Sequence, residues 1–196
     1  MKYLDHTELL GQAAELPPEA ARLDDQLTLR DGNVVRVRAI RADDDGRLCE
    51  FHRHLSPESI TYRFFHFMPE LPANDAKHFT HVDYHDRMAL VATIGEGATE
   101  AIIGVVRYDR IDEHTAEVAF VVADKWQGHG IATALLHRLA AYARALGFSR
   151  LIAITMDQNA RMVEVLHHSG FPWTACYREG SLEVHLDITQ PPVMRL

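Results

Sequence analysis

The sequence predicts an α/β fold of the α+β type, in which a mixed and mostly antiparallel β-sheet is flanked by helices. Two observations predict antiparallel pairs: two apolar runs surround the polar turn Gly95-Glu96-Gly97, and two more runs follow each other at the C-terminal end. A third observation predicts one parallel pair, because a long helical pattern separates two apolar runs near residues 120 and 150.

The first of the expected strands and helices begins at Val34. Residues 34 to 40 alternate partly and are β-branched, which predicts a strand. A helix is expected from 42 to 54, since three aspartates enrich its first turn. Ser56-Pro57 predicts the start of a second helix, with serine as N-cap and proline at the first position, and Asn74 or Asp75 starts a third. Residues 88 to 94 and 102 to 108 are the expected strands of a hairpin.

The second half begins with an expected strand at residues 115 to 122. Apolar residues then recur at helical spacing from Ile131 to Leu146, and Gly147 is typical of a left-handed helix cap. Residues 151 to 155 predict a buried strand. A short helix is expected from 160 to 168, capped by Asn159 and closed by Gly170. Residues 173 to 177 and 182 to 187 are expected to pair as a final hairpin.

The chain is expected to hold one domain, at residues 34 to 188, between an N-terminal extension and a short tail. Residues 1 to 33 are polar and acidic, with Pro17-Pro18 in the middle and a turn at Asp31-Gly32-Asn33. Leu9-Leu10 and Leu23 predict short helices that dock on the domain. Residues 189 to 196 form the tail. The 196 residues suffice for one domain of ordinary size with such a segment.

Composition limits the class of partner and the compartment. The net charge of −8 argues against broad binding to nucleic acid or to anionic membranes, and it suits a basic or amine-bearing substrate. No apolar stretch is long enough to cross a bilayer, and the N-terminus has no apolar signal core, so we expect a cytoplasmic protein. Cys49 and Cys176 are expected to be two separate thiols. The oligomeric state stays open.

Thirteen histidines raise the question of a metal site. His78, His81 and His85 would share a face if residues 75 to 85 were helical. No carboxylate or thiol cluster with metal-ligand spacing accompanies them in the sequence. We therefore expect surface histidines and no metal.

The most informative segment is a glycine loop between the strand at 115 to 122 and the long helix. A strand that enters a glycine turn and then a helix aims unpaired backbone N–H groups at one point, which suits a phosphate or pyrophosphate. A Walker A loop would need a Gly-Lys-Ser/Thr ending, and a dinucleotide fingerprint would need a third small residue where Thr133 stands. A helix start with a tight turn is the alternative. The loop reads Gln127-Gly128-His129-Gly130-Ile131-Ala132.

The spacing Gln-x-x-Gly-x-Ala and the surrounding order of strands and helices resemble the GNAT acetyltransferases over nearly all of residues 34 to 188. This resemblance implies the GNAT fold and an N-acetyltransferase that uses acetyl-CoA as cosubstrate, with the glycine loop on its pyrophosphate. It also implies that backbone groups of Phe120, Val121 and Val122 pair with the pantetheine arm. A second segment, Asn159-x-x-Met162-x-x-x-Leu-x-x-x-Gly-Phe, is similar to the other coenzyme-contacting segment of these proteins. Asn159 also fits a plain helix cap.

Glu117 is the candidate catalytic residue. Alternation places it on one strand face with Ala119 and Val121, both apolar, and a carboxylate on a covered face has a raised pKa. Transfer to an amine needs a general base that removes a proton from the ammonium group. A structural ion pair with Arg107 or Arg110 fits the sequence equally. The resemblance implies the base, directly or through water.

Two further stretches refine the resemblance. Residues 56 to 65, with Asp83-Tyr84 and residues 88 to 92, look like the catalytic domain of bacterial Pat-type protein lysine acetyltransferases. Such enzymes modify a lysine of acyl-CoA synthetases, which makes a protein lysine the expected acceptor. A small-molecule amine acetyltransferase and a non-catalytic acyl-CoA sensor are the alternatives. Many members of the family have at this position a Tyr that protonates the departing thiolate. This chain has His167 there, and we expect His167 to be dispensable.

Overall fold

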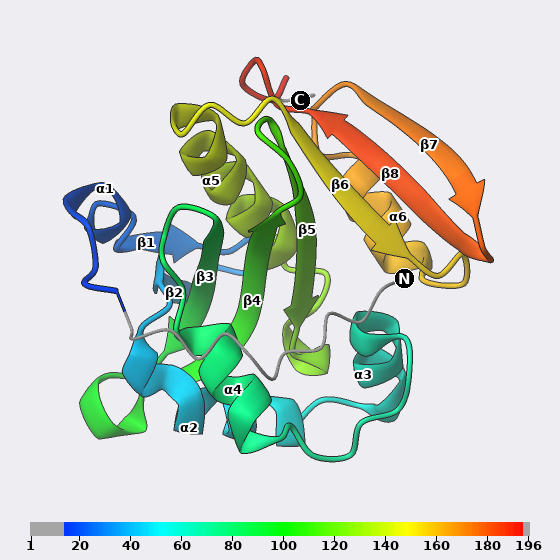
Figure 1. Ribbon diagram of the computed structural model, residues 1–196. Coiled ribbons are helices and arrows are strands. Elements are labelled where there is room, and N and C mark those ends of the chain that lie inside the picture. Colours follow the sequence, from blue (N-terminus) through cyan, green and yellow to red (C-terminus); the bar gives the residue numbers. More distant parts are fainter. Residues whose placement is uncertain (1–13, 194–196) are drawn as a thin grey trace.

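In the computed structural model, which describes residues 14 to 193, eight strands form one sheet in the order β1-β2-β3-β4-β5-β6-β8-β7 (Figure 1). Neighbouring strands within these residues pair antiparallel except β5 and β6, which are parallel. The predicted mixed, mostly antiparallel sheet is therefore confirmed. The strands are β1 (Asp25–Thr28), β2 (Val34–Ala39), β3 (Arg87–Ile94), β4 (Ala101–Arg110), β5 (Thr115–Val122), β6 (Arg150–Thr155), β7 (Trp173–Arg178) and β8 (Ser181–Asp187).

Helices cover both faces of the sheet (Figure 1). α2 packs against β4 and α4, and α3 packs against β5, whereas α5 packs on β3, β4 and β5 and contacts α6. None of the described helices is long and apolar enough to cross a bilayer. The helices are α1 (Pro18–Ala21), α2 (Asp45–Arg53), α3 (Pro57–Phe64), α4 (Ala73–Thr80), α5 (Ile131–Ala145) and α6 (Ala160–His167), with short 3₁₀ turns η2 (Ala42–Asp44), η3 (Gly97–Thr99) and η4 (Asp124–Trp126).

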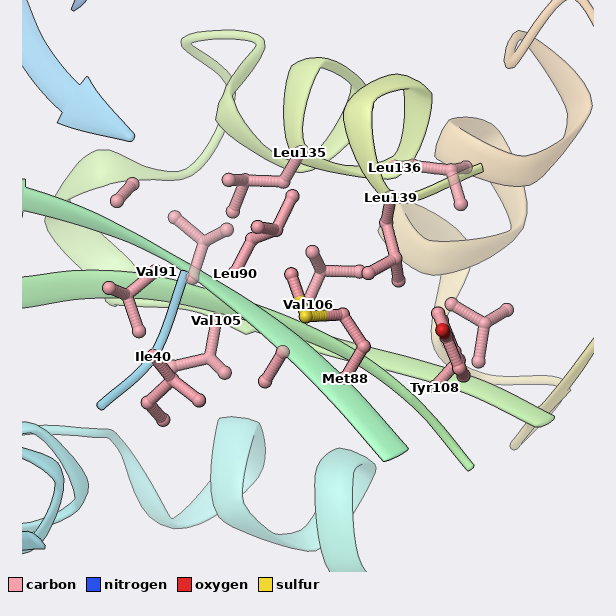
Figure 2. Packing of buried hydrophobic residues seen from close by; sticks show 14 of the residues in the cluster. Ile40, Met88, Leu90, Val91, Val105, Val106, Tyr108, Leu135, Leu136 and Leu139 are labelled. Carbon is pink, nitrogen blue, oxygen red and sulfur yellow. The ribbon is translucent and has the colours of Figure 1, made fainter. Parts of the chain in front are cut away.

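The core lies on the two faces of β3 and β4. Alternate residues of a strand point to opposite faces, so a strand covered on both sides is apolar throughout. Leu90 and Val106 meet Leu135 and Leu139 of α5 on one face, while Val91 and Val105 lie with Ile40 on the other (Figure 2). Leu90, Val91 and Val106 have no exposed surface. The sheet is thus held between α5 and the layer of α2 and α4.

Local signals in the sequence placed most helix ends correctly. The Ser56 hydroxyl accepts a hydrogen bond from the Ser59 N–H and caps α3, whose first residue is Pro57. Gly147 follows α5 with φ of +92°, and the Asn159 side chain caps α6. These are short-range interactions, which is why the sequence pattern was sufficient.

β1 lies in the segment that the sequence analysis assigned to the extension. It pairs with β2, and Leu23, just before it, packs on the core. Its sequence Asp25-Gln26-Leu27-Thr28 is polar and mostly exposed, as suits the edge of a sheet, so no apolar run marks it. The predicted helix at Leu9-Leu10 lies outside the described residues. The domain boundaries themselves stay a prediction.

The helical arrangement considered for His78, His81 and His85 does not form. α4 ends at Thr80, and His81 has an extended ψ of +72° as its C-cap. His85 instead lies in the turn before β3, where its Nδ1 contacts Asp86 Oδ1 at 2.8 Å. The three side chains therefore do not follow one helix face.

A buried ion network fixes β2 against the start of α2. The Arg38 guanidinium, 1% exposed, binds both carboxylate oxygens of Asp44, at 2.7 and 2.8 Å, and donates from Nε to Glu100 Oε1 at 3.0 Å. Burial alone would raise the pKa of Asp44 and Glu100, but the hydrogen bonds and charge of Arg38 outweigh it and lower both pKa values. The network therefore stabilises the fold near neutral pH, and this contribution is lost as the pH falls below the ordinary values of 3.8 and 4.5.

We expect Arg38→Gln to lower the free energy of unfolding by about 3–5 kcal/mol, because it removes the buried cation that binds both carboxylates and leaves only the more exposed Arg36 and Arg47 near them. Urea denaturation at pH 7 measures the loss. The matched control is Arg53→Gln on α2, whose exposed pair with Glu50 lies outside the network and should contribute less than about 1 kcal/mol. Equal losses in the two variants would contradict the structural role of the buried network.

Candidate active site

The strands β5 and β6 diverge along their length (Figure 1). A cleft of about 730 Å³ is lined by residues of both strands and of α3, α5 and α6. The two strands pair only over Thr115, Ala116 and Glu117, although β5 continues to Val122. Backbone groups of residues 118 to 122 that face β6 are thus left without a strand partner. Ten of the eleven residues predicted to bind the coenzyme line this cleft: Phe120, Val121, Val122, Gln127, Gly128, Gly130, Ile131, Ala132, Asn159 and Met162.

The glycine loop, residues 127 to 132, brings the start of α5 to the cleft. Gly128 and Gly130 have φ of +80° and +87°, which an L-residue adopts only under strain. Gly130 is the N-cap of α5 and no side chain caps the helix, so its first-turn N–H groups are left for a ligand. The positive end of the helix dipole adds to the attraction for an anion. This arrangement suits a phosphate group.

Side-chain hydrogen bonds hold the glycine loop in place. The Gln127 amide donates to the Val122 carbonyl at 3.0 Å and to the Ser59 hydroxyl at 3.2 Å, and its oxygen accepts from Arg161. Asp124 in turn accepts hydrogen bonds from Ser56 and from the Ser59 hydroxyl. The Gln127 side chain therefore links β5, α3 and α6 by hydrogen bonds and stabilises the loop.

His129 is the one predicted coenzyme residue outside the cleft lining. Its Nδ1 contacts the Gln127 carbonyl at 2.9 Å, and its Nε2 lies 3.2 Å from Asp31 in the turn between β1 and β2. The same turn carries Arg30, which lines the cleft and whose Nε is 4.0 Å from the place where a Cβ on Gly130 would stand. Sequence analysis missed Arg30 because only the β1–β2 pairing brings it to the glycine loop.

The opposite wall of the cleft comes from α3 and α6. Asn159 accepts a hydrogen bond from the Met162 N–H at 3.2 Å, so its side chain is occupied as a helix cap while it lines the cleft. The Tyr62 hydroxyl donates to Glu58 and to the Gln158 carbonyl, each at 3.3 Å. Tyr62 thus joins α3 to the turn before α6.

Glu117 stands beyond the end of the cleft, two residues along β5 from Ala119 at its wall. The side chain is exposed to solvent, in contrast to the covered position expected from its apolar neighbours. Nearby protein atoms nevertheless remove part of the water around the carboxyl. This burial raises its pKa, the charge of Asp109 on β4 raises it further, and Arg63 and Arg107 oppose both. A carboxylate with a raised pKa and access to solvent can accept a proton from a bound amine.

The structural alternative for Glu117 was a pair with Arg107 or Arg110. Arg107 Nε instead donates to Asp109 at 3.0 Å, and Arg110 binds Asp86. Within residues 14 to 193, the Glu117 side chain forms no hydrogen bond or ion pair, although its backbone pairs with β4 and β6. Asp109 lies directly across from it in the β4–β5 register, which explains the repulsion between the two carboxyls.

His167 does not line the cleft. Its ring packs against Trp173 and His168, with centroids 5.1 and 4.8 Å apart. His168 lies at the cleft wall, where its Nδ1 contacts the Glu164 carbonyl. That His167 is dispensable stays a prediction.

A family model described as an acetyltransferase (GNAT) domain matches residues 35–172. The chain is 30% identical over 145 residues to an acetyltransferase of Pseudomonas aeruginosa, a match that covers 74% of this chain and 78% of that protein. It is 29% identical over 167 residues to the acetyltransferase Pat of Mycolicibacterium smegmatis, covering 84% of this chain and 48% of the relative. The chain therefore spans about half the length of that second protein.

Solved structures agree with the family model. The GNAT domain of PAT from S. lividans is 40% identical, with a TM-score of 0.81 over 88% of this chain and 99% of that chain. An acetyltransferase-like structure from Salmonella typhimurium, solved with acetyl-CoA, shares the fold at 20% identity and a TM-score of 0.62, over 80% of this chain and 95% of that one. The chain belongs to the GNAT acetyltransferase family.

Proposed function

We propose that this GNAT acetyltransferase moves an acetyl group from acetyl-CoA to the side-chain amine of a protein lysine. The observation that carries the proposal is the solvent-accessible Glu117 side chain beside the cleft, which has a raised pKa and no partner among residues 14 to 193. A lysine on another protein needs an approach that is open to solvent, and Glu117 offers one. The resemblance to Pat-type protein lysine acetyltransferases, together with the 40% identity to the GNAT domain of PAT, supports the class of acceptor. A cytoplasmic location stays a prediction.

The cleft suits coenzyme A from end to end. The first-turn N–H groups of α5 would bind its pyrophosphate, and the unpaired edge of β5 at Phe120, Val121 and Val122 would pair with the pantetheine arm. Trp126 at the wall supports this fit, because its buried Nε1–H has no acceptor within the described residues. A buried donor without an acceptor costs free energy that a polar ligand atom can recover.

In the proposed reaction Glu117 removes a proton from the lysine ammonium group, directly or through water. The free amine then attacks the thioester carbonyl carbon, so that a C–N bond forms and the C–S bond breaks, and the nitrogen loses its second proton to the leaving thiolate or to solvent. Backbone N–H groups near Phe120 polarise the carbonyl oxygen. The leaving thiolate needs little protonation near neutral pH, since the ordinary pKa of a thiol is about 8.5. His167 therefore has no required part.

We expect Gly130→Asp to weaken acetyl-CoA binding by at least about 100-fold, because it places a carboxylate against the pyrophosphate site. Isothermal titration calorimetry measures binding. Gly180→Asp is the matched control: Gly180 has a similar φ of +79°, lies in open space in the β7–β8 turn, and should leave affinity unchanged. If Gly130→Asp binds acetyl-CoA as tightly as the parent, the glycine loop does not hold the coenzyme.

We expect Glu117→Gln to lower turnover at pH 7 by about 100- to 10,000-fold, because the amide cannot accept the proton. The deficit should shrink at high pH, where more of the amine is already neutral. His167→Ala is the comparison variant and should lose less than about tenfold. Unchanged turnover in Glu117→Gln would remove this residue from the mechanism, and a large loss confined to His167→Ala would make His167 the acid.

The pH dependence gives a second test of Glu117. A base with a raised pKa places the acid limb of kcat/KM above the ordinary value of 4.5, since activity needs the deprotonated carboxylate. Asp109→Asn removes the negative neighbour across the strand, so the pKa of Glu117 falls and the limb moves to lower pH. If the acid limb of kcat/KM stays at the same pH in Asp109→Asn, the limb reports the titration of a group other than Glu117.

The class of acceptor is tested by incubating the protein with acetyl-CoA and a bacterial lysate, followed by mass spectrometry of acetylated lysines. We expect a small set of sites that is absent when Glu117→Gln replaces the parent. A parallel screen of polyamines and aminoglycosides tests the small-molecule alternative. Turnover on these amines without modified protein would overturn the lysine assignment, and binding without any turnover would indicate a non-catalytic sensor.

A further inference from the structure

The β7–β8 hairpin lies at one edge of the sheet (Figure 1). It brings together three side chains with metal-ligand chemistry. Cys176 on β7 lies directly across from Glu183 on β8, and His185 follows on the same face of β8. Their Sγ, carboxylate oxygen and ring nitrogen atoms all lie within 4.8 Å of one another. His185 Nε2 is 2.6 Å from Glu183 Oε1. Among the residues that the structure describes, these three are the one group of His, Cys, Asp or Glu side chains close enough to share a metal ion.

The donor set selects the kind of ion. A thiolate, an imidazole and a carboxylate are the three ligand types that Zn²⁺ uses, whereas Mg²⁺ and Ca²⁺ take oxygen ligands. Bond lengths of about 2.0–2.3 Å around a tetrahedral zinc place ligand atoms about 3.3–3.8 Å apart. The observed limit of 4.8 Å exceeds this range by about 1 Å, and the 2.6 Å contact between Glu183 and His185 is shorter than it, so the side chains must move to bind the ion. Cys176 is a free, exposed thiol, and Glu183 and His185 are half-buried, so an ion can enter from solvent.

The hairpin backbone holds the three residues in register. β8 pairs with β7 on one side and with β6 on the other, so Glu183 and His185 lie on a strand that is fixed at both edges. The competing cation is Arg178, whose Nε lies 3.9 Å from Glu183 Oε2 and whose side chain is 71% exposed. Such an exposed pair is worth at most about 1 kcal/mol, so an ion displaces it easily.

The group lies on the same face of the sheet as Glu117. Glu117 pairs with Ile152 on β6, and Ile152 pairs with His185 on β8, so the three residues form one row across the sheet. With neighbouring strands about 4.8 Å apart, Glu117 and His185 are separated by about 10 Å. An ion held by His185 would therefore border the open surface beside Glu117.

We propose that Cys176, Glu183 and His185 bind a zinc ion through three protein ligands, with a fourth position open to water. Binding exchanges the thiol proton of Cys176 for the metal, and the proton passes to solvent. The inference stands apart from the proposed acetyl transfer, because it rests on the hairpin alone. It departs from the expectation of no metal, since Cys-x₆-Glu-x-His has no recognised metal spacing and only the register of the hairpin joins the three residues.

Cobalt(II) titration of the reduced full-length protein tests the site. Co²⁺ takes the place of zinc and gives a thiolate-to-cobalt charge-transfer band only when a cysteine binds it. We expect one equivalent of Co²⁺ to produce this band, and Zn²⁺ to abolish it by displacement. Since the chain has two cysteines, Cys176→Ser should remove the band and Cys49→Ser should leave it unchanged. Circular dichroism checks that both variants remain folded.

The other two ligands are tested by zinc calorimetry. Glu183→Gln and His185→Ala should each weaken binding by at least about 10- to 100-fold, the loss that follows removal of a partner of a metal ligand. His167→Ala, on the opposite face beside Trp173, should leave zinc affinity unchanged. Absence of the charge-transfer band in the parent, or its persistence in Cys176→Ser, would overturn the proposal. Retained acetyltransferase activity in Cys176→Ser would leave the proposed function standing in either case.

Discussion

The divergence of β5 from β6 is the constraint on which the site depends. The two strands share hydrogen bonds at only one end, through Thr115, Ala116 and Glu117. Beyond that point a continuous sheet would have filled the space that is now the cleft. The divergence leaves backbone donors and acceptors of β5 facing a solvent-filled gap, and these groups must find partners in water or in a ligand. The position of Glu117 at the last paired residue puts its carboxyl where the gap begins.

Packing on the other face keeps this gap open. α5 cannot move toward β6 because Leu135, Leu136 and Leu139 are fully buried against the sheet. Gly104 on β4 lets the first turn of α5 approach closely, since a Cβ there would stand 3.2 Å from Ile131 Cγ2. The helix N-terminus is thus anchored by apolar contacts on one side while its N–H groups face the cleft on the other. The same helix therefore supplies both core packing and a set of uncapped N–H groups at the cleft.

Charged residues divide into two groups by their surroundings. Arg38, Asp44 and Glu100 satisfy one another in the interior, so their charges stabilise the fold near neutral pH. Arg107 and Asp109 form a similar pair beside Glu117 but do not satisfy that carboxyl, which keeps a raised pKa. Nothing in the pairing of Arg107 prevents Glu117 from acting on a proton. A group left without a partner in a partly dry setting is typical of a functional site.

The sequence by itself determined the features that depend on neighbours along the chain. The mixed sheet, the Ser56-Pro57 helix start, the Gly147 and Asn159 caps, and the glycine turn before α5 all follow from short-range patterns, and the structure contains each of them. Ten of the eleven residues predicted to bind the coenzyme line one cleft, because most of them belong to the glycine loop and the start of α6, which are local motifs.

Only the tertiary structure decided the features that join distant segments. The polar strand β1, the contact of Asp31 with His129 and the place of Arg30 at the cleft depend on pairing between β1 and β2. The solvent access of Glu117 depends on which helices reach the far side of the sheet, and the meeting of Cys176 with His185 depends on the register of β7 and β8. Register and layer contacts are set by packing across the whole chain, so no local pattern records them.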